Sequence, residues 1–180
     1  MTGMTTWRLV HGLVASVALA GPVPAMAQAQ PVDEFELSAM IECRLKAETY
    51  NAFALWLTGE PGAIESLGWT EIAGVNPFLR EFQLPAPVAV FGRSTSFVAF
   101  TATGPLGVFD GVTPAEIAAP LGVVALVDTP EKFLGEKVVL EESEEVDGLR
   151  YETRVTLNVS TVDTHPGKVF AGCSYSIGVS

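Results

Sequence analysis

Few side chains in this sequence combine the types and the spacing that catalysis needs. Downstream of residue 27 there is one histidine, His165, and it lies in a His-Pro-Gly sequence typical of a turn. The sequence contains no Gly-x-Ser-x-Gly elbow, no Cys-x-x-Cys pair and no phosphate-binding loop. We therefore expect His165 to be a solvated turn residue and the protein to act without an activated Ser or Cys nucleophile.

Metal ligands are also sparse, apart from one acidic run. One histidine and two distant cysteines do not supply the three or four ligands of a zinc site. Five acids fall within seven residues, but they lack the Asp-x-Asp-x-Asp-Gly order of a calcium loop: Glu141, Glu142, Glu144, Glu145 and Asp147. Such runs are typical of solvated hairpin tips. We expect no metal and no cofactor, and we regard these acids as a candidate surface for a basic partner.

The overall charge excludes one class of partner. The chain carries 21 acidic and 10 basic residues, a formal net charge of -11. Nucleic-acid binding depends on clustered Lys and Arg at the phosphates, so we do not expect it here. A search for a partner should begin in residues 128–154, where 13 of the 27 residues are charged.

The first residues have the features of a secretory signal peptide. Arg8 precedes a short apolar stretch, prolines follow, and Ala25-Met26-Ala27 has the small-x-small pattern of a cleavage site. We expect residues 1–27 to be removed and residues 28–35 to be a flexible arm. The apolar stretch is too short to span a bilayer, and no later stretch is long enough. The sequence therefore predicts export to a periplasmic or extracellular space.

Two periodicities predict where the cysteines meet. Apolar residues recur at helical spacing over residues 36–57, with Met40, Cys43 and Ala47 in one stripe, which predicts a long N-terminal helix. Residues 149–161 and 169–179 alternate with period two around a turn, which predicts a C-terminal β-hairpin with Cys173 on its dry face. Both sulfurs then point to one interior, and an oxidising compartment favours a Cys43–Cys173 disulfide.

The middle of the chain predicts the remaining elements. Residues 84–127 hold three charges and contain short β-prone runs separated by Gly and Pro turns. Thr113-Pro114-Ala115-Glu116 is a capping box that begins a short helix, and residues 128–131 are a second candidate start. We expect a single α+β domain over residues 36–180: a long helix packed on an antiparallel sheet, with one or two short inserted helices.

These features leave three hypotheses for function. The first is an exported, non-enzymatic binding or accessory domain that contacts a protein or an envelope component. The second is a carrier of a small apolar ligand, with aromatics of the uncharged middle as candidate lining: Phe91, Phe97, Phe100 and Phe109. The third is a hydrolase that uses paired carboxylates, which spacing alone does not identify. Asn76-Pro77-Phe78, with Trp69 nearby, is a candidate exposed aromatic loop.

Overall fold

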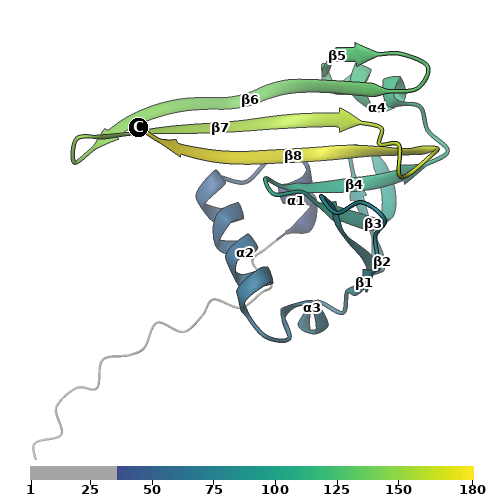
Figure 1. Ribbon diagram of the computed structural model, residues 1–180, viewed down its shortest axis with the longest axis horizontal. Helices are drawn as coiled ribbons and strands as arrows, with labels where there is room; N and C mark the ends of the chain where they lie inside the picture. Colours follow the sequence, from purple (N-terminus) through teal and green to yellow (C-terminus); the bar gives the residue numbers. More distant parts are fainter. Residues whose placement is uncertain (1–35) are drawn as a thin grey trace, which may run out of the picture. The chain divides into compact units, whose positions relative to one another are not determined.

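A single antiparallel sheet organises the protein, and the predicted α+β class is confirmed. The computed structural model describes residues 36–180, so the predicted signal peptide and N-terminal arm lie outside the described residues. Eight strands pair in the order β1-β2-β3-β4-β8-β7-β6-β5 (Figure 1). Their bounds are Thr70–Ile72 (β1), Arg80–Val90 (β2), Arg93–Phe100 (β3), Pro105–Asp110 (β4), Val124–Asp128 (β5), Phe133–Val146 (β6), Leu149–Ser160 (β7) and Lys168–Val179 (β8).

The C-terminal hairpin is where the sequence predicts it. Strands β7 and β8 pair from Tyr151 opposite Val179 to Ser160 opposite Phe170, with Leu157 opposite Cys173. The predicted dry face is buried near the centre of the sheet, where Val155, Leu157 and Val159 lie in the core. At the far end of the same face, Leu149 and Val179 are exposed. The alternation therefore predicts the side-chain directions correctly but not how far the core extends.

The prediction of a single long N-terminal helix is wrong. Residues 36–57 form two short helices, α1 (Leu37–Ile41) and the first part of α2 (Ala47–Gly59), separated at Cys43, whose φ of 59° is left-handed. No Gly or Pro explains the break; tertiary hydrogen bonds do. Tyr175 donates its hydroxyl to the Met40 carbonyl at 2.8 Å, and the Phe91 amide donates to the Glu42 carboxylate at 2.7 Å. In a continuous helix the Met40 carbonyl would accept from the Arg44 amide; here it accepts from Tyr175, and the Arg44 amide donates to the Ala39 carbonyl instead.

The shorter helices follow local signals. Helix α4 (Pro114–Leu121) begins with the predicted capping box, in which Thr113 and Glu116 bond reciprocally. Residues 128–131, the second candidate, form a turn between β5 and β6 instead of a helix, with Thr129 and Lys132 bonded to each other. A four-residue helix that the sequence analysis did not predict, α3 (Ala63–Ser66), follows α2.

Helix α2 lies in the curve of the sheet. Figure 1 shows the long strands β6, β7 and β8 passing over one end of α2, while β1 to β4 bend down beside it. The core fills the space between them and includes an aromatic cluster. In it, Phe53 and Phe82 each contact both Trp69 and Phe100. Among the described residues, no helix is long and apolar enough to cross a membrane.

Candidate functional site: an apolar groove beside helix α2

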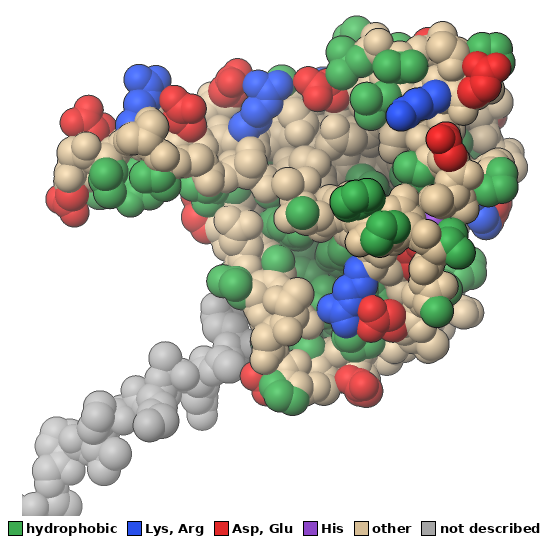
Figure 2. Space-filling view, viewed as in Figure 1, with side chains coloured by type: hydrophobic (Ala, Val, Ile, Leu, Met, Phe, Trp, Pro, Cys, Tyr) green, Lys and Arg blue, Asp and Glu red, His purple; other side chains and the backbone are tan. Residues whose placement is uncertain are grey.

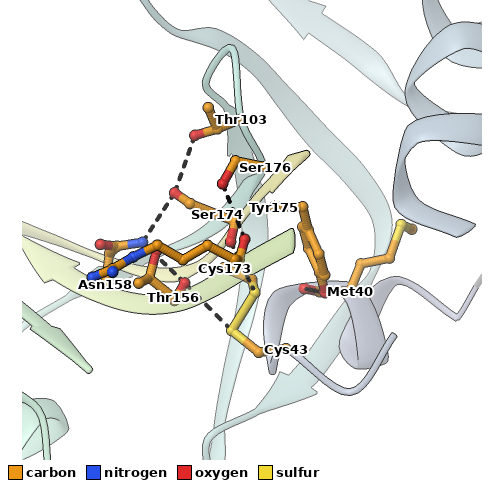
Figure 3. The surroundings of a disulfide bond; sticks show 10 residues. Met40, Cys43, Thr103, Thr156, Asn158, Cys173, Ser174, Tyr175 and Ser176 are labelled. Carbon is orange, nitrogen blue, oxygen red and sulfur yellow. Dashed lines mark hydrogen bonds between the residues drawn. A yellow bond between two sulfur atoms is a disulfide. The ribbon is translucent and has the colours of Figure 1, made fainter. Parts of the chain in front are cut away.

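The Cys43–Cys173 disulfide fixes helix α2 on the sheet, and the predicted pairing is confirmed. The two Cα atoms are 5.2 Å apart, and Cys173 is fully buried on β8. Figure 3 shows the bond next to Tyr175, which points toward Met40. On the other side, the rings of Tyr175 and Tyr50 stack with centroids 4.6 Å apart. The start of α2 is therefore held against β8 by a covalent bond and by ring packing.

A groove of about 780 Å³ opens along the exposed side of this helix. One wall is α2, the opposite wall is the segment 77–80 that leads into β2, and the end of β3 closes the base. Figure 2 shows a hollow with hydrophobic side chains on this face, between α2 and the lower strands. The volume lies within the range of small-molecule sites in proteins, about 300–1,000 Å³.

The groove has a fixed base and an exposed apolar rim. Tyr50, Leu57 and Phe100 line it from below and are almost fully buried. At the rim, Leu55 of α2 is 73% exposed and Phe78 of the opposite segment is 83% exposed. A ligand between these two side chains would remove both from water, with a favourable hydrophobic contribution of about 25 cal/mol per Å².

The groove carries one charged lining residue, and its charge is already compensated. Arg80 donates two hydrogen bonds to the Glu71 carboxylate, at 2.6 and 2.8 Å. The hydrogen bonds from Arg80 hold the pKa of Glu71 below its usual value, so this carboxylate stays ionised at neutral pH. Because Arg80 is matched in this way, the groove favours a neutral ligand over an anionic one.

The segment that carries Phe78 is anchored from behind. The Asn76 side chain accepts a hydrogen bond from the Phe78 amide at 3.0 Å and donates one to the Thr164 hydroxyl at 3.2 Å. Next to it, His165 Nε2 lies 3.0 Å from the Glu81 carboxylate. The side chains of His165 and Glu81 are 14% and 12% exposed, so the prediction that His165 is a solvated turn residue is wrong.

The aromatics proposed from sequence as pocket lining do not gather in one place. Phe100 lines the groove, whereas Phe109 lies in the core and Phe91 occupies the β2–β3 turn. Phe97 borders a separate cavity of about 300 Å³ next to His165. Of the candidate aromatic loop, Phe78 is exposed as expected, while Trp69 packs into the aromatic cluster. The sequence analysis missed Leu55 and Tyr50 as groove residues.

The acidic run is divided between the two faces of β6, because successive side chains of a strand point to opposite faces. Glu141 pairs with Arg154 at 3.1 Å, whereas no ion pair involves Glu142, Glu144, Glu145 or Asp147 among the described residues. Over residues 36–180, no group of three or more His, Cys, Asp or Glu is placed to hold a metal ion.

Comparisons with protein-family models, with curated proteins and with solved structures found no match to this chain.

Proposed function

We propose that this protein is an exported binding domain whose groove beside α2 takes a small, neutral, apolar ligand. The observation that carries the proposal is the groove itself: an apolar recess of about 780 Å³ with a packed aromatic base. Its rim exposes the apolar side chains of Leu55 and Phe78 to water. A ligand that covers these side chains would be stabilised by their burial.

Two further features support the proposal. The disulfide and the Tyr50–Tyr175 stack hold one wall before any ligand arrives, and Asn76 holds the other. A preformed site loses little conformational entropy on binding. The disulfide is also what an oxidising, extracytoplasmic compartment permits, which fits the signal peptide predicted from sequence.

Fluorescence titration with Nile red, an uncharged probe of apolar sites, tests the groove. We expect saturable binding of one probe per protein. Phe78→Ser should weaken binding about tenfold, since burial of a Phe side chain contributes about 1.5–3 kcal/mol. Because Phe78 is 83% exposed, this change should not disturb folding. Leu126→Ser, on the exposed part of β5 and remote from the groove, should bind as the wild type does.

Helix α2 supplies a second pair of variants. Ala54 lines the groove, whereas Ala52 is on the same helix, is exposed and does not line it. Ala54→Trp should fill the groove and abolish binding, while Ala52→Trp should leave binding unchanged. Equal effects of both changes would overturn the proposal. It would also be overturned by ester turnover that disappears in His165→Gln, because a reaction dependent on His165 would favour the hydrolase hypothesis.

A further inference from the structure

Strands β6, β7 and β8 continue beyond the core that α2 covers. We call this three-stranded part the blade: residues 141–154 and 176–180. Its inner face is the continuation of the face that packs on α2, because Leu140, Val155 and Tyr175 stand side by side at its base and the pairing continues outward without a shift. Figure 2 shows hydrophobic side chains along the inner side of the projecting strands.

An apolar surface on this inner face has no cover among the described residues. Four side chains form it, and they are between 36% and 59% exposed: Val146, Leu149, Ile177 and Val179. Tyr151 lies between them, opposite Val179. Since the same alternation is buried under α2 nearer the centre, the blade presents a core-like face without a packing partner.

Carboxylates without ion-pair partners border this apolar surface. Glu142 lies opposite Thr153, and Glu144 opposite Tyr151, so both project from the inner face. Glu48, near the start of α2, lies at the same recess as Glu142 and Glu144. Within the described part of the chain, none of these three acids forms an ion pair.

The outer face of the blade is different. There Arg154 bonds Glu141, and Arg150 bonds Ser143 and lies 3.2 Å from Glu152. The basic residues of the blade are therefore used on the outer face. The inner face keeps an uncompensated negative charge beside its apolar side chains.

We propose that the inner face of the blade binds a basic amphipathic helix of a partner protein. Apolar side chains of that helix would cover Leu149, Ile177 and Val179, and its Lys or Arg side chains would reach Glu142, Glu144 and Glu48. The dimensions match, because three strands are about 10 Å wide and a helix is about 10 Å in diameter. The partner would extend the helical layer that α2 begins on the same face of the sheet.

Charge excludes two other occupants. A second copy of this chain would bring the same carboxylates into contact, in a protein whose net charge is already -11. Residues 28–35 of the chain itself contain Asp33 and Glu34 and no Lys or Arg, so they do not complement the inner face. A basic partner does.

Titration of the purified protein with synthetic peptides tests this surface. The probe is a helical peptide of about 14 residues of Leu and Lys, about 21 Å long, to match the six residues of β7 in the blade. Its control is the same pattern with Glu in place of Lys. We expect saturable binding of the Lys peptide, weakened at higher salt, and no binding of the Glu peptide. Binding of both peptides with equal affinity would overturn the proposal.

Neighbouring acids on opposite faces of β6 provide matched variants. Glu142→Gln combined with Glu144→Gln should weaken binding of the Lys peptide at least threefold, whereas Glu145→Gln, on the outer face, should change it less than twofold. Leu149→Ser should also weaken binding of the Lys peptide but leave Nile red binding unchanged. The proposal for this surface and the proposal for the groove can therefore be refuted independently. An equal loss in Glu145→Gln, or a dimer that Leu149→Ser dissociates, would contradict the proposal.

Discussion

His165 and Glu81, 84 residues apart in sequence, are joined by a hydrogen bond of 3.0 Å between Nε2 and the carboxylate. The bond links the turn before β8 to the start of β2, directly behind the segment that carries Phe78. The second oxygen of Glu81 is buried and accepts no hydrogen bond from the described residues. The Glu81 carboxylate therefore depends on His165 for its side-chain partner.

Removal of the imidazole should destabilise the protein. His165→Ala leaves the buried Glu81 carboxylate without its side-chain hydrogen-bond partner, which costs about 1–3 kcal/mol. Urea unfolding followed by fluorescence measures the loss of free energy. Glu81→Leu in the His165→Ala background should recover part of it, because no buried charge then remains. If Glu81→Leu lowers the free energy of unfolding as much in the His165→Ala background as it does in the wild type, the two side chains are not coupled.

The disulfide should be complete and strongly stabilising. Alkylation of the unreduced, denatured protein should leave its mass unchanged, because both cysteines are in the bond. Replacement of Cys43 and Cys173 together by Ala should lower the free energy of unfolding by up to about 4–5 kcal/mol, as expected for a closed loop of more than 100 residues. Two alkylated thiols in the unreduced protein would contradict the bond.

The stacked tyrosines predict a loss of stability in alkali. Burial raises the pKa of Tyr50 to about 12, and burial also raises the pKa of Tyr175. In the unfolded chain a tyrosine titrates near pH 10, so above this pH the unfolded state loses protons first. The contribution of these two tyrosines to stability should therefore be constant up to about pH 10 and fall between pH 10 and 12. Thermal unfolding of Tyr50→Phe should show a shallower fall over that range, and an unchanged fall would assign it to other groups.

The sequence predicts those parts of the fold whose cause is local. Alternation in residues 149–161 predicts β7, and the order of Thr113 to Glu116 predicts the start of α4. The break at Cys43 was missed because its causes are remote: the hydroxyl of Tyr175 and the amide of Phe91. The groove was missed for the same reason. Leu55 and Phe78 are far apart in sequence, and only the packing of α2 in the curve of the sheet places them on one rim.

The capping box of α4 predicts a measurable local effect. Thr113 accepts a hydrogen bond from the Glu116 amide, and the Glu116 side chain accepts one from the Thr113 amide. Thr113→Ala should lower the free energy of unfolding by about 1 kcal/mol. Thr113→Ser keeps the hydroxyl and should cost little. Equal losses in the two variants would mean that the methyl group of Thr113, not its hydroxyl, stabilises the helix start.

Two glycines of β8 separate close backbone approach from strand propensity. A Cβ on Gly172 would overlap the carbonyl oxygen of Pro105 on β4, so Gly172→Ala must displace one strand from the other. Gly178, in the blade part of the same strand, has room, since its nearest atom to an added Cβ is the Glu152 carbonyl oxygen at 3.9 Å. Gly172→Ala should destabilise the protein by more than about 2 kcal/mol, with Gly178→Ala close to the wild type. Urea unfolding of both variants measures the difference, and similar stabilities would show that β4 and β8 are not paired as closely as described.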